Sequence, residues 1–226
     1  FQDPMTSLNP VFTIGNQLGE AIRLHTNRKG KEVRDRAIEM LELVGINEPE
    51  KRIKQYPFEL SGGMARRVLI ASAVIEKPRL IIADEPTPGL DARAAARILG
   101  HFRELAEEGA GVLFITHDLE LALTVADRVA VFYAGETIEE ADAADFSDAA
   151  RLRHPFTRAL WNAVPSREFR PIPGAQPYPG TVSEGCPFAG QCGKCRAECR
   201  RAENIPLEPF EGGMVRCLYP EKGVEL

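Results

Sequence analysis

Two acidic side chains follow an apolar run near the middle of the sequence. Asp84 and Glu85 come directly after residues 80–83, Leu-Ile-Ile-Ala, which have the composition of a buried parallel strand. At the carboxyl end of such a strand, one carboxylate is placed to bind Mg²⁺ and the next to polarise a water molecule. The pattern therefore predicts magnesium-dependent hydrolytic chemistry, with Glu85 as the general base or water-orienting residue.

Three small residues precede this strand by one helix. Ser61 is a good N-terminal cap, and Gly62 and Gly63 open a helix that we expect to extend to about Ile75. Small residues let the free backbone N–H groups and the positive end of the helix dipole approach a phosphate closely. Taken alone, the Ser-Gly-Gly run would also fit a simple loop, and the Asp-Glu pair a solvated strand end.

The surrounding pattern predicts the elements that position these residues. Apolar residues at helical spacing over 11–22 and 33–44 indicate a small helical region. Strands and helices then alternate, with expected bounds of 80–83, 92–107, 111–116, 119–125 and 128–133. This alternation predicts an α/β core with a parallel sheet.

The C-terminal part has a different composition. Prolines and glycines are dense over 171–180 and indicate a linker, and all five cysteines follow it. Four of them have the spacing C-x5-C-x6-C-x17-C, and Cys195 is extra; the four are Cys186, Cys192, Cys199 and Cys217. Clustered thiolates suit zinc or an iron–sulfur cluster, although the spacing is not that of a standard zinc ribbon, and reduced structural thiols remain an alternative. Because this segment has little apolar sequence, we expect it to need a crosslink to hold its fold.

Composition limits the function classes. The chain has 226 residues, of which 44% are hydrophobic and 27% charged, as in ordinary globular proteins. Its formal net charge of -5 gives no general attraction to nucleic acid or to an anionic bilayer. No apolar run reaches the roughly 18–20 residues that span a membrane. We therefore expect any membrane role to be peripheral, through a partner.

The paired motifs resemble those of the ATPase subunits of ABC transporters. Leu60-Ser61-Gly62-Gly63-Met64 and the run 80–87 occur in the family's order, together with Gln2, Asp91 in Pro-Gly-Leu-Asp, and His117 in Leu-Phe-Ile-Thr-His-Asp. The resemblance implies a P-loop NTPase-type α/β fold with a helical subdomain, and ATP and Mg²⁺ as cofactors.

The same resemblance implies a role for each matching residue. Gln2 would contact Mg²⁺ and the attacking water, Asp91 would lie at the dimer seam, and His117 would reach the γ-phosphate. Asp84 would bind Mg²⁺, while Ser61, Gly62 and Gly63 would face nucleotide held by a partner subunit.

Departures from the family pattern concern three places. No Gly-x-x-x-x-Gly-Lys-Ser/Thr motif occurs, and Gly30-Lys31 lies in a polar stretch that we interpret as a loop. We therefore expect the chain to be truncated before the glutamine loop, and to be inactive alone. Arg66 stands where the family usually has Gln, and Pro88-Gly89 replaces the usual Ser-Ala before Leu-Asp.

The segment 154–160, His-Pro-Phe-Thr-Arg-Ala-Leu, resembles the segment that marks the C-terminal extension of ATPases in the dipeptide, oligopeptide and nickel importer group. Cys186-Pro187-Phe188 matches the opening of the cysteine tail in that group. The resemblance implies a [4Fe–4S] cluster on the four spaced cysteines, with zinc as runner-up. It also divides the chain into 1–78 (glutamine loop, helical subdomain and signature helix), 79–150 (α/β ATPase core) and 151–226 (C-terminal extension).

The expected function is that of an ATPase subunit energising import of peptides or nickel. Its implied partners are a second ATPase subunit in a homo- or heterodimer, two membrane permease subunits and, indirectly, an extracytoplasmic binding protein, with no nucleic acid. Its implied location is the cytoplasmic face of the membrane. Two alternatives are a soluble ABC ATPase of DNA repair or translation, and a non-catalytic module whose working part is a metal-binding cysteine tail. The sequence does not specify the transported substrate.

Overall fold

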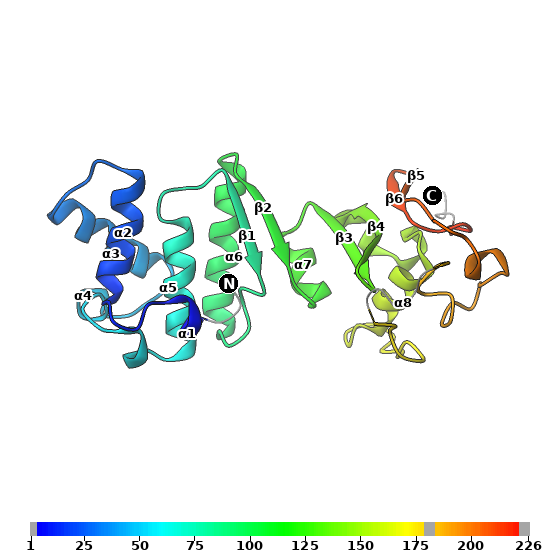
Figure 1. Ribbon diagram of the computed structural model, residues 1–226, viewed down its shortest axis with the longest axis horizontal. Helices are drawn as coiled ribbons and strands as arrows, with labels where there is room; N and C mark the ends of the chain where they lie inside the picture. Colours follow the sequence, from blue (N-terminus) through cyan, green and yellow to red (C-terminus); the bar gives the residue numbers. More distant parts are fainter. Residues whose placement is uncertain (1–3, 179–183, 222–226) are drawn as a thin grey trace. The chain divides into compact units, whose positions relative to one another are not determined.

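The computed structural model describes residues 4–178 and 184–221 (Figure 1). The chain forms two compact units, residues 1–117 and 118–226, which are described separately below. The division into three segments that the motifs suggest remains a prediction.

The first unit begins with a small helical region. Its helices are α1 (Pro4–Ser7), α2 (Ile14–His25), α3 (Lys31–Leu43), α4 (Pro49–Arg52) and α5 (Gly62–Val74), with the 3-10 turn η1 (Pro57–Glu59) before α5. Helices α2, α3 and α5 pack against one another (Figure 1). Their contact buries apolar residues at helical spacing: Ile14, Leu18, Ile22, Val33, Ala37, Met40, Leu41, Val68 and Ala71. The helices expected from periodicity are confirmed.

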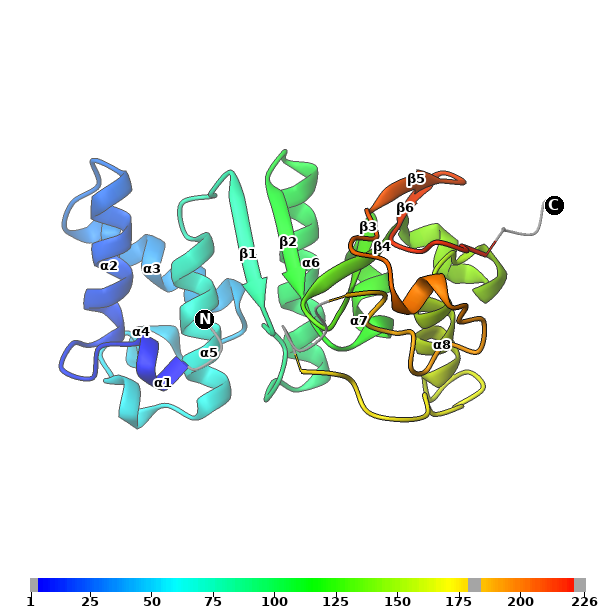
Figure 2. The same ribbon diagram turned by 45° about the vertical axis from the view of Figure 1, so that its right-hand side comes forward.

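The rest of the first unit is a β-α-β arrangement. Strand β1 (Leu80–Asp84), helix α6 (Ala92–Glu107) and strand β2 (Gly111–Ile115) follow in order, and α6 lies beside the two strands (Figure 2). The strands are parallel, with Leu80 opposite Gly111 and Asp84 opposite Ile115. This register brings the residues that follow each strand to the same edge of the sheet.

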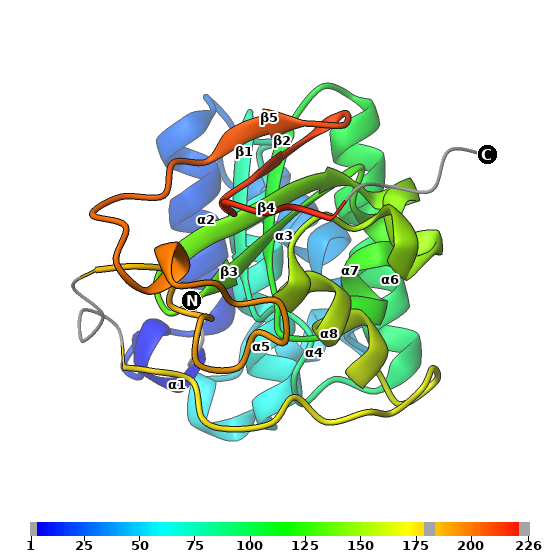
Figure 3. The ribbon, with the colours of Figure 1, turned by 90° about the vertical axis from the view of Figure 1, so that its right-hand side faces the viewer.

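The second unit is built on an antiparallel sheet. Helix α7 (Leu119–Val125) precedes β3 (Arg128–Tyr133) and β4 (Glu136–Asp142), and the sheet is completed by β5 (Glu208–Phe210) and β6 (Gly213–Val215) in the order β3-β4-β6-β5 (Figure 3). Along the chain, four elements lie between β4 and β5: the 3-10 turns η2 (Ala143–Ser147) and η3 (Ala149–Arg151), helix α8 (Pro155–Ala163) and the 3-10 turn η4 (Glu198–Arg200).

Two expectations about this unit need correction. Strand β3 continues the strand-helix alternation along the chain, but it pairs antiparallel with β4, so parallel pairing in the described residues is limited to β1 and β2. The C-terminal segment also contributes to an apolar core, although its composition contains little apolar sequence. Phe188 belongs to the apolar core of this unit beside Tyr133 and Phe156, and Ile172 of the proline-rich stretch packs against that core. Apolar contacts therefore anchor the tail.

Within the part of the chain that the structure describes, none of the helices combines the length and apolar character that crossing a bilayer requires.

Candidate functional site

Glu85 and His117 meet at the carboxyl edge of the parallel strand pair. The Glu85 Oε1 atom lies 2.7 Å from Nδ1 of His117 and accepts a hydrogen bond of 3.0 Å from its backbone N–H. Thr116 Oγ1 donates to Glu85 Oε2 at 3.4 Å. The Glu85 side chain is 22% exposed, whereas that of His117 is 83% exposed. An oriented carboxylate thus lies beside an accessible imidazole, an arrangement suited to holding water and a polar ligand.

The backbone at Glu85 has an unusual conformation. Its φ angle is 45°, in the left-handed region that residues with a Cβ rarely adopt. Two hydrogen bonds hold it there: its N–H donates to Ile115 O at 2.9 Å, and Arg66 Nη1 donates to its carbonyl at 2.5 Å. Strained backbone of this kind concentrates at functional sites. In the sequence, Arg66 stands out only as a departure from the family pattern, because nothing there relates it to the end of the strand.

Ser61, Gly63 and Asp91 form a second group, at the start of two helices. Ser61 caps α5, accepting a hydrogen bond from Met64 N at 3.3 Å, and Asp91 caps α6, accepting from Ala94 N at 2.9 Å. The hydrogen bond from Ala94 lowers the pKa of the Asp91 carboxyl below its usual value. A Cβ atom on Gly63 would lie 2.9 Å from the Gly89 carbonyl oxygen, so a glycine is needed for this close approach.

Gly62 differs from Gly63, since a Cβ built on it would meet nothing within 4 Å. Both Ser61 and Gly62 are exposed at the N-terminal end of α5. Asp84 is the last residue of β1 and lies opposite Ile115. Gln2 lies outside the described residues, and its predicted role therefore stays a prediction.

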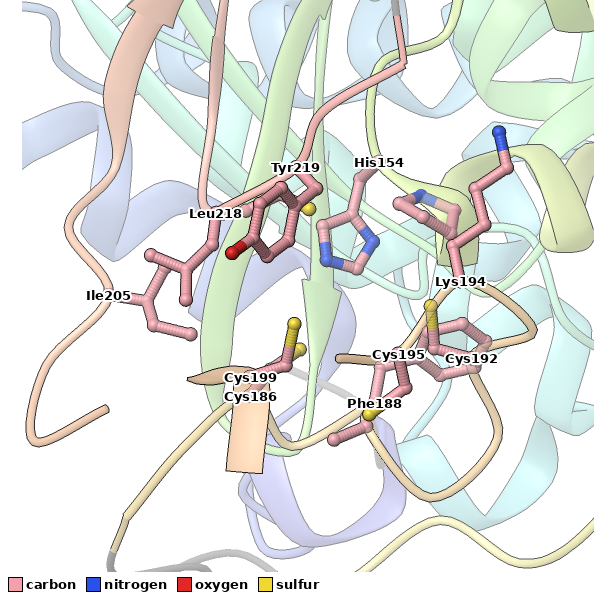
Figure 4. Close-up of a pocket in the computed structure, with 13 residues that line it drawn as sticks. His154, Cys186, Phe188, Cys192, Lys194, Cys195, Cys199, Ile205, Leu218 and Tyr219 are labelled. Atoms are coloured by element: carbon pink, nitrogen blue, oxygen red, sulfur yellow. The ribbon is translucent and has the colours of Figure 1, made fainter. Parts of the chain in front are cut away.

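All five cysteines of the chain line one pocket in the second unit, here named the cysteine pocket: Cys186, Cys192, Cys195, Cys199 and Cys217. Figure 4 labels the first four of them. The thiols are free, and Cys199 is buried. Backbone hydrogen bonds join the segments that carry them, including Cys186 N to Cys199 O at 2.7 Å. The fold therefore gathers residues that are up to 31 positions apart, from 186 to 217, in one place.

Burial favours the protonated form of three thiols in the cysteine pocket. Burial raises the pKa of Cys186 to about 11, and it also raises the pKa values of Cys192 and Cys217. Among the described residues, no three His, Cys, Asp or Glu side chains are close enough together to hold one metal ion. The metal centre expected on the four spaced cysteines therefore stays a prediction.

His154, which the sequence shows only as part of the motif at 154–160, also lines the cysteine pocket. Its side chain is 1% exposed, and burial lowers its pKa to about 4. Nothing in the sequence around His154 and Pro155 indicates that the imidazole lies beside cysteines 32 or more positions away.

Comparison with known families gives two matches. The pattern of the family described as "ABC transporter" matches residues 1–88, and that of "Oligopeptide/dipeptide transporter, C-terminal region" matches residues 138–199. The first match includes Ser61, Gly62, Gly63, Asp84 and Glu85, and the second includes Cys186, Cys192, Cys195 and Cys199. Asp91, His117 and Cys217 lie outside both matched ranges.

Curated relatives extend the similarity over the whole chain. The chain is 41% identical to the oligopeptide transport ATP-binding protein AppD of Bacillus subtilis, covering 100% of this chain and 70% of that protein. It is 44% identical to the dipeptide transport ATP-binding protein DppD of the same organism, over 100% and 68%. With the oligopeptide transport ATP-binding protein OppD of Mycobacterium bovis it shares 42% identity, over 98% of this chain and 37% of that protein.

Solved structures agree with this similarity. The dimeric post-hydrolysis ATP-binding cassette MJ0796, bound to ADP and Pi, matches with a TM-score of 0.57 and 30% identity over 63% of this chain and 61% of that one. The class of protein is therefore an ATP-binding cassette. Within this class, the chain belongs to the family of ABC transporter ATP-binding proteins, in the oligopeptide and dipeptide group.

Proposed function

We propose that the protein is an ATPase subunit that energises import of peptides through an ABC transporter. The observation that carries this proposal is the contact of Glu85 with His117 at the ends of two parallel strands, in a chain of this family. Glu85 would orient or deprotonate the attacking water, and His117 would contact the γ-phosphate. Asp84 and Gln2 would hold Mg²⁺, which neutralises charge on the phosphoryl group during transfer.

The second group of site residues would serve the partner subunit. Ser61 and Gly62, exposed at the start of α5, would donate to phosphate oxygens of nucleotide bound by that subunit. Gly63 and Asp91 would hold the adjacent turn, because the Gly89 carbonyl packs against Gly63 and Asp91 caps the following helix. The 226 residues contain no phosphate-loop motif, so hydrolysis requires a loop from outside them.

The assembly that fits this role has three kinds of partner. A second ATPase subunit would complete the nucleotide sites, two permease subunits would carry the substrate, and an extracytoplasmic protein would deliver it. The subunit would then work at the cytoplasmic face of the membrane, held there by the permeases. Peptide is favoured over nickel because the relatives compared above are named for oligopeptide and dipeptide transport.

The cysteine pocket would hold a metal centre, with a [4Fe–4S] cluster favoured over zinc. Support comes from the five free thiols around one pocket, and the preference for a cluster rests on the family resemblance of the four spaced cysteines. Cys186, Cys192, Cys199 and Cys217 would be the ligands, and Cys195 would be spare. The cluster would supply a crosslink in addition to the backbone hydrogen bonds and apolar contacts that join these segments.

Reconstitution tests the transport role. The natural protein that contains these residues, assembled with its permeases in proteoliposomes, should take up labelled oligopeptides only with ATP and the binding protein present. Uptake of nickel without peptide would reassign the substrate. Hydrolysis that never depends on the permeases, with no uptake of either, would favour a non-transport ABC ATPase.

A further inference from the structure

The imidazole of His154 has one satisfied and one unsatisfied nitrogen. Its Nδ1 accepts a hydrogen bond of 3.0 Å from the Phe156 backbone N–H, which caps α8. Its Nε2 is buried and has no hydrogen-bond partner among the described residues. The ring lies in the wall of the cysteine pocket, around the same space as the labelled cysteines (Figure 4). Buried polar atoms without partners are rare in folded proteins, so this atom needs an explanation.

The capping contact determines what Nε2 can do. Because Nδ1 uses its lone pair to accept from Phe156, the proton of the neutral ring must be on Nε2. A protonated nitrogen has no lone pair for a metal. His154 is therefore a hydrogen-bond donor toward the pocket and is excluded as a metal ligand while it caps α8.

Neighbouring groups hold the ring in this orientation. The buried Glu139 carboxylate accepts hydrogen bonds of 2.8 Å from the backbone N–H groups of both Arg153 and His154. The ring of Phe188 packs beside the imidazole, with centroids 6.1 Å apart. The side chains lining the pocket include five thiols, the Lys194 ammonium and the Tyr219 phenol, but no carboxylate. Sulfur is thus the main acceptor class available to Nε2.

We propose that the Nε2–H of His154 donates a hydrogen bond to a sulfur atom of the metal centre in the cysteine pocket, either a cysteine thiolate or a bridging sulfide. This inference rests on the metal centre proposed above. A hydrogen bond to a ligand sulfur stabilises negative charge on the cluster, and therefore favours its reduced form.

Two variants separate the donor from the helix cap. In H154N the side-chain oxygen of Asn can still accept from Phe156 N, since Asn is a good cap, but no donor reaches the position of Nε2. In H154Q the longer amide reaches that position with an N–H group and the cap is lost. Thermal unfolding of both variants reports the cap separately from the donor.

The measurement is the midpoint potential of the anaerobically purified full-length protein. In H154N we expect the potential to fall by about 59 mV, which corresponds to a tenfold change in the equilibrium constant of a one-electron couple. H154Q should stay nearer to the wild type. If the metal is zinc, the readout is its loss to a chelator, which H154N should accelerate by about 10- to 100-fold.

Other results would overturn either the hydrogen bond alone or the metal centre as well. Equal potentials, or equal zinc loss, in the wild type and H154N would overturn the hydrogen bond while leaving the metal centre intact. Imidazole scattering in the X-ray absorption spectrum of the metal would overturn it too, because His154 would then be a ligand. Wild-type protein that binds no metal would overturn the metal centre, and this inference with it.

Discussion

Glu85 binds His117 through a single oxygen atom, with Oε1 at 2.7 Å from the ring Nδ1 and 3.0 Å from the backbone nitrogen. Since a carboxylate only accepts, Nδ1 of His117 carries the proton that is donated to Glu85. The two strand ends are thereby coupled: the residue proposed to act on water also orients the residue proposed to contact phosphate.

This coupling predicts the effect of removing the ring. H117A in the natural protein should lower the rate of ATP hydrolysis on the order of a hundredfold, the scale seen when one group that stabilises transition-state charge is lost. The control is H25A, because His25 is exposed at the end of α2. The steady-state rate of ATP hydrolysis by both variants tests this prediction. Equal rates for H117A and H25A would remove His117 from the site.

The two glycines at the start of α5 should respond differently to alanine. In G63A the new Cβ would lie 2.9 Å from the Gly89 carbonyl, so we expect the free energy of unfolding to be lower by about 1–3 kcal/mol than in G62A. G62A meets nothing within 4 Å and should keep its stability. It should nevertheless hydrolyse ATP more slowly, because its methyl group would obstruct the phosphate proposed to bind there.

Urea unfolding and hydrolysis assays on the same preparations test this pair. Equal unfolding free energies of the two variants would show that the Gly63 and Gly89 backbones can separate without cost. Unchanged hydrolysis by G62A would show that no phosphate approaches Gly62.

The 226-residue polypeptide by itself should bind MgATP weakly and hydrolyse it negligibly. It lacks the amide cradle and lysine of a phosphate loop, although Asp84 and Glu85 are present. Calorimetric titration with MgATP measures the affinity. Micromolar binding with steady turnover would mean that the nucleotide site has been misplaced.

Anaerobically purified protein should be brown, absorb broadly near roughly 400 nm and contain roughly four irons per chain. C199S should lose both colour and iron, because Cys199 is a buried member of the cysteine pocket. C195S is the matched control and should retain them. Stoichiometric zinc without iron would show that the metal is zinc. Freely titratable thiols without any metal would leave a structural role for the cysteines.

Local pattern was enough to predict the first unit well. Helix caps at Ser61 and the apolar periodicity of α2, α3 and α6 are properties of short segments, and the structure confirms those elements. Strand pairing is not local. The pattern of 128–133 is that of a buried strand in either kind of sheet, and its antiparallel partner β4 follows only two residues later. The alternation of strands and helices along the chain could not distinguish parallel from antiparallel pairing.

The site residues also divide into those that local pattern predicted and those that depend on long-range contacts. The types and order of Glu85 and His117 predicted that they share one site, and the structure brings them into contact. Their chemical roles, and that of Asp84, stay predictions. Arg66 and His154 were missed as contributors because each acts through a long-range contact, on the Glu85 carbonyl and in the cysteine pocket. The grouping of the cysteines also depends on apolar anchors such as Phe188, which the low apolar content of the tail conceals.

The central claim is that Glu85 activates or orients the attacking water, and E85Q in the natural protein tests it most directly. Gln keeps the size of the side chain and can still accept from the His117 backbone, but it cannot take a proton. We expect ATP binding to stay near the wild-type affinity while hydrolysis slows at least about a hundredfold. E107Q, at the exposed end of α6, is the matched control. Hydrolysis by E85Q at the wild-type rate would contradict the account and reduce Glu85 to a structural residue at a strand end.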